Sequence, residues 1–548
     1  MRKIGKLELT WVGKYDRHEI EPRILVEDKT KSFGDPESEN MLIHGDNLIA
    51  LQALQQDFAG KIKCIYCDPP YNINAANGHY DDNIENSEWL SLMSQRLRLL
   101  KELLADDGVI LVQIDKLQSA YLKILMDEVF TREAYVTTIA IRMSATSGFK
   151  IEHSDKTIVK NVEYIHVYSR NLVIKPSYEA AEYDSHYSNI IKAKGDGIFL
   201  LCNLLREEVV ISEFEKYKLK NNSENLAKLY RVSDVFKKFV SDNREFIGRT
   251  HTAPTGAERE REELEKVLKN NNDVVARIYS GEKYYIKKTN TGFNQFIPIS
   301  LKFNMVDSVN DYSMQISNIL GDWWDGFYLD MGNVDNEGDV YFKNSKKPER
   351  LIFRILNMFT SQYDYVLDSF LGSGTTIAVA QKMNRKWIGI EMGEHAYSLV
   401  KPRIDSVISG RDDTGVTTFV NWQGGGGYKF YELAPSLLVK NSKLPVYQIN
   451  PEYTFEMLCE AICKLEGFRY KPQGLYHGHS SEKRFIHITK EFVNAEYIKS
   501  VAANLGEDQS LLIYGTKIQS GLRLPDNIEV KKIPKDLLKK CEFESEVC

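Results

Sequence analysis

The tetrapeptide Asp68-Pro69-Pro70-Tyr71 has the residue types of a site for a flat ring that carries an amino group. It follows the apolar run Ile62–Cys67, which predicts a buried strand. The Asp68 carboxylate and the Pro69 carbonyl can accept hydrogen bonds from an exocyclic amino group, while the Tyr71 ring can stack on the base. Proline fixes φ and adds no competing N–H, so these acceptors stay oriented. The alternative is a strand-ending turn beside a core tyrosine.

A second motif lies far downstream and has the order strand, glycine loop, helix, strand, acid. Tyr365–Asp368 predicts a short buried strand, Ile377–Met383 a helix, and Trp387–Ile390 a strand that ends at Glu391. The loop between the first strand and the helix is Phe370-Leu371-Gly372-Ser373-Gly374-Thr375-Thr376. Glycines let a cofactor approach the backbone, and an acid after the second strand can bind ribose hydroxyls.

The glycine loop differs from the two common phosphate-binding loops. Ile377 occupies the position of the third glycine in G-x-G-x-x-G, and the loop lacks the lysine of a P-loop. A nucleoside cofactor without phosphates therefore fits better than a dinucleotide or a triphosphate. An ordinary tight turn is the alternative for the loop taken alone.

Together the two motifs resemble those of amino-methyltransferases of DNA, and specifically the modification subunits of type III restriction-modification systems. Asp-Pro-Pro-Tyr corresponds to the catalytic motif of that family and Phe-Leu-Gly-Ser-Gly-Thr-Thr to its cofactor loop, in the order of the β class. Further matches are Leu42-Ile43-His44-Gly45-Asp46-Asn47-Leu48, Lys346-Lys347-Pro348-Glu349 and Gly424-Gly425-Gly426-Gly427-Tyr428. One departure follows Tyr71: family members often continue with Asn-Thr-Gly, whereas this chain has Asn72-Ile73-Asn74.

The resemblance implies an enzyme that transfers a methyl group from S-adenosylmethionine to adenine N6 in double-stranded DNA. The catalytic residues would be Asp68, Pro69, Pro70 and Tyr71, acting on a base flipped out of the duplex. The implied cofactor-binding residues are Asp46, Lys347, Asp368, Phe370, Gly372, Ser373, Gly374, Thr375, Thr376 and Glu391. Asp46 could equally cap the following helix, and Lys347 could be a surface lysine.

Three rival functions are open at the level of sequence. The target could be cytosine N4, although that class more often has serine at the position of Asp68. The substrate could be RNA. The chain could also be a non-catalytic subunit that recognises DNA for a partner. A nuclease or translocase activity of its own is not expected, because no G-x-x-x-x-G-K-[ST] is present for ATP.

The motifs predict a discontinuous α/β core, a Rossmann-like methyltransferase fold with a mostly parallel sheet and a circular permutation. We expect residues 1–170 to hold the N-terminal region and catalytic half, and 311–435 the cofactor half. Residues 171–310 would form an inserted target-recognition domain with helical stretches at Lys216–Phe239 and Arg259–Asn270. After a glycine linker, residues 440–548 predict a small α/β module for docking or dimerisation.

Composition agrees with a large cytoplasmic enzyme. The 548 residues are 43% hydrophobic, and no apolar run reaches the length of a membrane span. The net charge of −6 gives no global sign of nucleic-acid binding, but DNA affinity depends on local Lys/Arg contacts. The expected partners are DNA, a separate restriction subunit and a second copy of the chain in a homodimer.

Seven cysteines do not indicate a disulfide framework. Cys64 and Cys67 form a C-x-x-C, but no second pair completes a zinc site, so both are expected to be structural and no metal is expected. Asp115, after the predicted strand Val109–Ile114, is a weaker site candidate. The pair Trp323-Trp324 is expected to pack in the core rather than to touch DNA.

Overall fold

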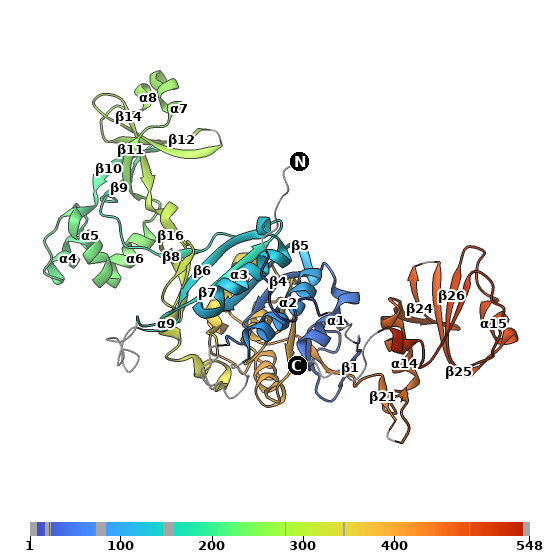
Figure 1. The fold of residues 1–548 in the computed structure, drawn as a ribbon. Helices are drawn as coiled ribbons and strands as arrows, with labels where there is room; N and C mark the ends of the chain where they lie inside the picture. The colour runs from blue at the N-terminus through green and yellow to red at the C-terminus, as the bar shows by residue number, and fades with distance from the viewer. Residues whose placement is uncertain are drawn as a thin grey trace. The chain divides into compact units, whose positions relative to one another are not determined.

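The computed structural model describes residues 8–16, 21, 23–72, 84–145, 158–279, 281–342, 346–441, 443–481 and 483–540. The chain divides into two compact units (Figure 1). One is built from the residues up to Lys175 together with those from Asp322 onward, and the other is Pro176–Gly321. The second unit overlaps the stretch 171–310 and extends beyond it to Gly321.

A single mixed sheet forms the centre of the first unit, in the order β1-β20-β3-β19-β18-β4-β5-β7-β6-β17, with β2 pairing β20. Neighbouring strands are parallel from β20 to β5, while β1, β2 and β7 join antiparallel. The strands are β1 Leu25–Glu27, β2 Phe33–Gly34, β3 Met41–His44, β4 Ile62–Cys67, β5 Leu104–Ile114, β6 Tyr135–Arg142, β7 Val162–Ser169, β17 Trp323–Trp324, β18 Tyr365–Asp368, β19 Lys386–Glu391 and β20 Gly427–Leu433. The predicted α/β class is confirmed.

Helices cover both faces of this sheet. Helices α1 (Asn47–Phe58), α2 (Asn86–Leu103) and α3 (Lys116–Phe130) share one hydrophobic cluster with β4 and β5. Helices α10 (Glu349–Phe359), α11 (Thr375–Lys382) and α12 (Lys401–Ile408) pack against one another in sequence order. Because crossovers are right-handed, connections that run in opposite directions along the sheet place their helices on opposite faces.

That reversal of direction occurs between β18 and β4, which are parallel neighbours. The chain leaves β4 toward β5 through α2, and leaves β18 toward β19 on the other side through α11. In open α/β sheets the crevice at the carboxyl ends of such strands is the usual ligand site. Asp68 directly follows β4 and Ser369 directly follows β18, so both sequence motifs end at this crevice.

The strands and helices predicted around the motifs are found within a few residues of their expected bounds. The run Ile62–Cys67 is β4, and Tyr365–Asp368 is β18. Two features differ. β7 is antiparallel to β5. After β5 the chain forms β6 first and then turns back antiparallel into β7, which lies between β5 and β6 in the sheet. The glycine run is no simple linker: Gly427 begins β20, which extends the central sheet beside β3.

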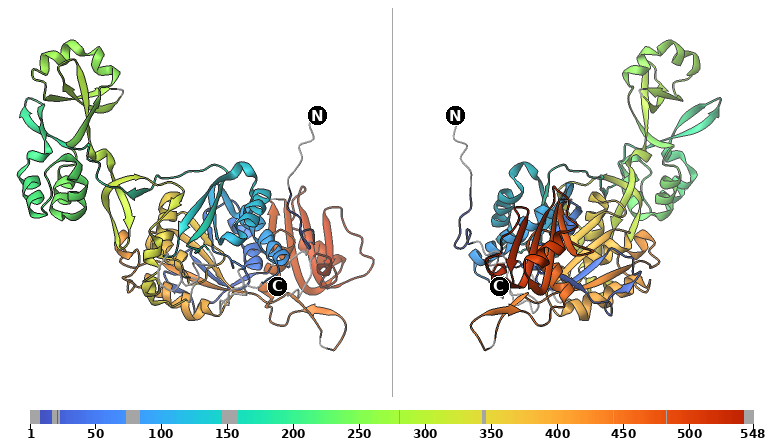
Figure 2. Two further views of the ribbon diagram at one scale, coloured as in Figure 1. Left: turned by 60° about the vertical axis from the view of Figure 1, so that its left-hand side comes forward. Right: turned by 90° about the vertical axis from the view of Figure 1, so that its right-hand side faces the viewer.

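The second unit (green in Figure 2) is built around a closed barrel of strands in the order β10-β12-β13-β14-β11-β9. Its strands are β9 Asn189–Gly195, β10 Ile198–Asn203, β11 Ile247–Thr252, β12 Asp273–Tyr279, β13 Glu282–Lys288 and β14 Phe293–Pro298. A small sheet of β15 (Phe303–Ser308), β16 (Asp311–Ile319) and β8 (Tyr178–Ala180) accompanies it.

The helices of this unit are shorter than the charged runs suggested. They are α4 Glu208–Lys216, α5 Leu226–Val232, α6 Asp234–Asp242, α7 Thr255–Arg259 and α8 Arg261–Val267. The stretch from Lys216 to Phe239 is broken because Ser233 ends one helix and caps the next, its hydroxyl accepting from the Phe236 N–H at 2.9 Å.

The last part of the chain (red in Figure 2) carries the sheet β23-β24-β25-β26-β27. Its elements are α14 Phe455–Leu465, β23 Arg469–Gln473, β24 Tyr476–Ser481, β25 Arg484–Val493, α15 Ala495–Ala502, β26 Ser510–Ile518 and β27 Ile528–Lys532, preceded by the pair β21 Leu438–Lys440 and β22 Tyr447–Ile449. The strands β25 and β26 are parallel, with α15 between them in sequence. Among the described helices we find none with both the length and the apolar character needed to cross a membrane.

Candidate active site

Asp68 and Tyr71 are held together at the carboxyl end of β4. The Tyr71 hydroxyl lies 2.8 Å from Asp68 Oδ1, and Lys347 Nζ donates to Asp68 Oδ2 at 2.6 Å. From α2, the Trp89 indole N–H donates to the Pro70 carbonyl at 2.9 Å and so fixes the turn between them. The predicted motif is therefore a turn fixed by hydrogen bonds: Lys347 and Tyr71 bond the Asp68 carboxylate, and Trp89 bonds the Pro70 carbonyl.

Lys347 was expected among the cofactor residues, with a surface lysine as the alternative. Its side chain is only 11% exposed, so the surface alternative is wrong. Its ammonium group lies 5.2 Å from the centre of the Tyr71 ring as well as against Asp68. Burial opposes its charge, but the carboxylates of Asp68 and Glu163 outweigh burial and raise the pKa of Lys347. Lys347 therefore stays protonated on the Asp68 side of the crevice.

Burial also acts on Asp68, and here it dominates. Removal from water raises the pKa of Asp68 above its usual value, although the Lys347 ammonium and the Tyr71 hydroxyl oppose this. Lys347 is thus the group that most favours the ionised form of Asp68, against the effect of burial.

Three neighbouring side chains were not found from the sequence. Glu163 of β7 lies with Oε2 at 2.8 Å from the Tyr71 hydroxyl, and Gln113 of β5 donates to the same oxygen at 2.7 Å. The Tyr66 hydroxyl donates to Gln113 Oε1 at 2.7 Å. Nothing in the sequence of the three strands singled these side chains out, and strand order was needed to bring them together.

The glycine loop turns tightly after β18 and enters α11. Gly372 and Gly374 have φ of +54° and +78°, values that favour glycine. Asp368 accepts from the Phe370 N–H at 3.0 Å and from the Thr376 hydroxyl at 2.5 Å, which ties the strand end to the helix start. Full burial raises the pKa of Asp368 to about 7, against these two hydrogen bonds.

The remaining polar groups of the loop bond within the protein. The Thr375 hydroxyl lies 3.2 Å from the Lys347 carbonyl and 3.1 Å from the Ser373 hydroxyl. Arg403 of α12 donates to the Ser373 carbonyl at 3.0 Å and to the Thr375 hydroxyl at 2.9 Å. Arg403 was not predicted, and it fixes the loop from its buried side.

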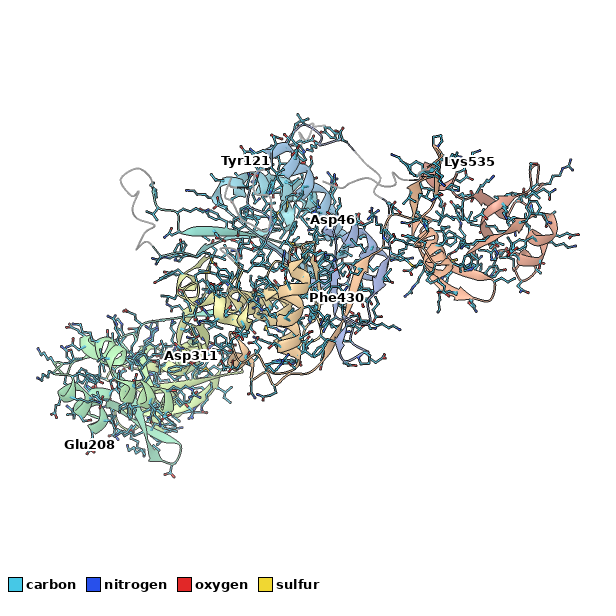
Figure 3. The ribbon with its side chains drawn as sticks, turned by 90° about the horizontal axis from the view of Figure 1, so that it is seen from below. Asp46, Tyr121, Glu208, Asp311, Phe430 and Lys535 are labelled. Atoms are coloured by element: carbon cyan, nitrogen blue, oxygen red, sulfur yellow. The ribbon has the colours of Figure 1, made fainter. Side chains whose placement is uncertain are left out.

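A pocket opens beside the loop, at the ends of β3, β18 and β19. Glu391 lies in its wall and accepts from the N–H groups of Gly372 at 2.8 Å and Gly393 at 2.9 Å. Asp46, labelled in Figure 3, lies in the same wall and also caps α1, accepting from the Leu48 N–H at 2.7 Å. The lining residues are Asp46, Asn47, Leu92, Arg96, Ser369, Phe370, Ile390, Glu391 and Met392.

The chemistry of this lining suits a nucleoside. Phe370, Ile390 and Met392 provide apolar walls for a base, and a Glu391 carboxylate that already accepts two N–H groups has lone pairs left for ribose hydroxyls. Arg96, not predicted as a site residue, is almost fully buried and lies 3.3 Å from Asp46 Oδ2. Among the predicted residues, Asp46, Phe370 and Glu391 line the pocket, whereas Asp368 and Thr376 lie behind the loop.

The residues that the sequence offered as weaker site candidates lie mainly in the core or at a helix cap. Cys64 and Cys67 are free and buried in β4. Asp115 is buried, caps α3 and forms an ion pair with Lys160. Trp324 is fully buried, as expected, whereas Trp323 is 48% exposed. No group of three or more His, Cys, Asp or Glu suited to a metal occurs in the described part of the chain. Residues 73–78, where the sequence departs from Asn-Thr-Gly, lie outside the described residues.

Comparison with known proteins gives concordant results. A family model described as DNA methylase matches residues 62–402. The chain is 33% identical over 475 residues to a Haemophilus influenzae protein named "Probable type III restriction-modification enzyme HindVI Mod subunit", covering 84% of this chain and 62% of that protein. It is 27% identical over 427 residues to the type III restriction-modification enzyme EcoPI Mod subunit of Escherichia phage P1, covering 69% and 61%.

The chain thus spans about three-fifths of the length of these two relatives. Among solved structures, the cytosine-N4-specific PvuII DNA methyltransferase aligns with a TM-score of 0.32 at 13% identity, over 67% of this chain and 86% of that one. The family model covers more than half of the chain, including β4, the Asp68 turn, the glycine loop and Glu391. This protein belongs to the DNA methylase family.

Proposed function

We propose that this protein transfers a methyl group from S-adenosylmethionine to the N6 amino group of adenine in double-stranded DNA, as the modification and recognition subunit of a type III restriction-modification system. The observation that carries the proposal is the Asp68–Tyr71–Lys347 cluster at the end of β4, beside the glycine loop after β18. A base acceptor and a nucleoside pocket thus meet at adjacent parallel strand ends.

On the base side, the protein must make the adenine amino nitrogen, a poor nucleophile, more reactive. The lone pair of an adenine amino nitrogen is delocalised into the ring. Hydrogen bonds from that group to the Asp68 carboxylate and the Pro69 carbonyl favour a tetrahedral nitrogen and stabilise the positive charge that develops on it. The Tyr71 ring, anchored through its hydroxyl, would stack on the flipped base, which costs roughly a few kcal/mol to extract from the duplex.

On the cofactor side, the bound S-adenosylmethionine would supply an activated methyl group on a sulfonium. The apolar walls of the pocket would hold its adenine, Glu391 its ribose hydroxyls, and Gly372 and Gly374 would allow close approach. We assign Asp46, Asp368, Phe370, Ser373, Thr375 and Thr376 to shaping or lining this site, and Lys347 to joining the two sides. Positioning for in-line attack provides the remaining acceleration.

The finer architecture is part of the same proposal. The catalytic strand β4 precedes the cofactor strand β18 in the chain, which supports a circularly permuted methyltransferase core. The separate unit Pro176–Gly321 lies between them in sequence, which supports an inserted target-recognition domain. The module at 440–548 would serve docking or dimerisation. A homodimer, a cytoplasmic location and association with a separate restriction subunit complete the proposal.

Cytosine N4 and RNA remain the rival substrates, and a silent recognition subunit the rival function. The intact Asp68 cluster favours catalysis over pure binding, because a binding subunit has no need of a carboxylate beside a buried lysine. Aspartate at position 68 favours adenine over cytosine, since the cytosine class more often has serine there.

Long-read methylation sequencing of DNA tests all of these together. The host is free of methylation and expresses the wild-type chain, Asp68→Ala, or the control Asp57→Ala, which changes an exposed aspartate of α1. Methyl-adenine at one short motif in the wild type and the control, and none in Asp68→Ala, is the expected result. Methyl-cytosine would select the cytosine rival. Absence of any mark with purified wild-type protein on DNA, with activity on RNA, would select the RNA rival.

A further inference from the structure

A second carboxylate, that of Glu163, contacts the Tyr71 hydroxyl in addition to Asp68. The hydroxyl oxygen lies 2.8 Å from Asp68 Oδ1 and 2.8 Å from Glu163 Oε2. Glu163 belongs to β7 and Asp68 follows β4, so the two acids come from different strands of the sheet and both lie against the hydroxyl of this tyrosine. Tyr71 therefore bridges two carboxylates.

Glu163 is held in place from behind. Gln113 donates its amide N–H to Glu163 Oε2 at 2.7 Å, and the Tyr66 hydroxyl occupies the other end of that amide, Oε1, at 2.7 Å. Because Tyr66 donates, the Gln113 oxygen must face it and the nitrogen must face Glu163. Both supporting side chains are buried. The orientation of Glu163 is thus built into the fold.

Glu163 gives the amino-group site a net negative charge. Lys347 lies 2.6 Å from Asp68 Oδ2 but 4.0 Å from Glu163 Oε2, so its ammonium mainly neutralises Asp68. The remaining negative charge is that of Glu163, whose side chain is 21% exposed. A nitrogen that becomes positive during methylation gains more from a site with net negative charge than from a neutral ion pair.

The number of hydrogens shared by Asp68, Tyr71 and Glu163 also indicates a role for Glu163 in proton transfer. One tyrosine hydroxyl supplies one hydrogen, which can satisfy only one of two ionised carboxylates. The contacts of the Tyr71 hydroxyl with Asp68 and Glu163 can both be hydrogen bonds only when these three residues together gain one further proton. Asp68 then donates to Tyr71, and Tyr71 donates to Glu163. Burial raises the pKa of Tyr71 well above its usual value, so the hydroxyl keeps a hydrogen to pass on.

We propose that Glu163 is a positioning residue that supplies the negative charge opposite the methylated nitrogen and takes up the proton that this nitrogen loses, through Tyr71. This inference rests on the proposed function. When the N–C bond forms and the S–C bond breaks, the nitrogen becomes an aminium. Its N–H bond then breaks to form an O–H bond on Asp68; the Tyr71 hydrogen passes to Glu163 Oε2 while Tyr71 takes the Asp68 proton. Glu163 finally releases the proton to water.

Other titratable groups surround this relay. Lys347 and Asp68 face it from the crevice, Tyr66 from β4, and Asp368 acts on Asp68 from β18. Lys160 lies nearby: burial lowers its pKa, and the Glu163 charge opposes that change.

The test compares full-length wild type, Glu163→Gln, Glu163→Asp and the control Glu102→Gln, which changes an exposed glutamate of α2. Single-turnover methyl transfer to duplex DNA that carries the unmethylated target motif is measured at saturating DNA and labelled S-adenosylmethionine. DNA affinity is measured by fluorescence anisotropy and cofactor affinity by calorimetry, so that loss of binding is separated from loss of rate.

Glutamine at position 163 preserves the size and the hydrogen bond to Tyr71 but not the charge. Aspartate preserves the charge, but its shorter side chain places the carboxylate farther from Tyr71. We expect Glu163→Gln to lower the methyl-transfer rate by about 100-fold with unchanged affinities for DNA and cofactor. Glu163→Asp should keep more of the rate than Glu163→Gln.

A purely structural role predicts the reverse order, because glutamine fits the site and aspartate does not. The inference is therefore overturned if Glu163→Gln retains the wild-type rate, or if it loses only affinity, while the wild type methylates DNA. Failure of the wild type itself to methylate any DNA is a different result, which overturns the proposed function and this inference with it.

Discussion

Lys347 and Asp68 are 279 positions apart in sequence, yet their side chains form a 2.6 Å ion pair with both groups largely buried. The pair joins the two halves of the core, because Asp68 follows β4 and Lys347 precedes α10. The Lys347 carbonyl in turn accepts from Thr375 of the glycine loop. One residue thus links the base side of the crevice to the cofactor side, and its removal should affect both.

Replacement of Lys347 by methionine should convert Asp68 into a buried carboxylate without a cation. Burial already raises the pKa of Asp68, and loss of the ammonium group removes the main opposing effect, so a larger fraction of Asp68 is protonated near neutral pH. We expect the methyl-transfer rate to fall about 10- to 100-fold at pH 7 and to recover in part as the pH rises.

The measurement is the single-turnover rate as a function of pH, with Lys61→Met as the control because Lys61 is exposed. An equal loss of rate at every pH, with no recovery in alkaline buffer, would contradict the assigned role of Lys347 in keeping Asp68 ionised.

Gly374 offers a selective way to disturb cofactor binding. Its φ is +78°, and a Cβ there would lie 3.1 Å from Val400 Cγ1. Gly374→Ala combines backbone strain of roughly 1–2 kcal/mol with a forced shift of the loop. The affinity for S-adenosylmethionine, measured by calorimetry, should fall at least about 10-fold, which corresponds to 1.4 kcal/mol.

Gly60→Ala is the matched control for this change. Gly60 has a similar φ of +68°, but nothing lies within 4 Å of its added Cβ, so it reports the backbone strain alone. Gly60→Ala should lower stability slightly and leave the cofactor affinity intact. Equal cofactor affinities for the two variants would refute the role given to the loop at Gly374.

The local parts of the site could be predicted from sequence, and the parts that depend on strand order could not. Asp68 and Tyr71 follow an apolar run whose bounds, Ile62 to Cys67, coincide with β4. The glycine loop was equally local, because its strand, turn and helix are consecutive. Periodicity and turn residues encode such features directly.

Glu163 and Gln113 show why the rest was missed. Each lies in a strand that was predicted, but the hydrogen bond between them depends on β7 pairing antiparallel with β5, in the register that sets Gln113 opposite Ile165. Strand order and register arise from tertiary packing, which periodicity within one strand does not specify. The barrel of the second unit was missed for the same reason, since its closure joins strands that are far apart in sequence.

Glu349 lies at the centre of a buried group of charges behind the cofactor loop. Its carboxylate lies 2.8 Å from Lys382 Nζ and 2.8 Å from Arg403, and all three side chains are at most 1% exposed. Burial opposes its ionisation, but the two cations hold the pKa of Glu349 below its usual value. Glu349→Gln leaves these cations with less compensation.

We expect this change to lower the free energy of unfolding by about 3–5 kcal/mol, the usual cost of breaking a buried ion pair from one side. Urea unfolding followed by circular dichroism measures it, with Glu102→Gln as an exposed control. A loss no larger than that of the control would mean that the buried cations find other partners. The cofactor affinity should fall too, because Arg403 also bonds the loop at Ser373.

Asp368 should make the stability of the core depend on pH in an unusual direction. Burial raises the pKa of Asp368 to about 7 in the folded protein, against about 4 for an unfolded aspartate. Between these two values the folded state binds the additional proton, so this residue stabilises the fold fully below about pH 4 and loses that contribution as the pH rises to about 7.

The substitution Asp368→Asn would keep an oxygen acceptor for the Phe370 N–H, while its NH2 group could donate to the Thr376 hydroxyl oxygen in place of the present bond, and it would not titrate. The difference in free energy of unfolding between wild type and this variant should therefore change steadily from pH 4 to pH 7, with the variant gaining relative to the wild type, and level off above pH 7. Urea unfolding at half-unit intervals of pH measures this difference and cancels the titration of all other groups. A difference that is constant across the range would mean that Asp368 is ionised throughout, held by its two hydrogen bonds despite its burial.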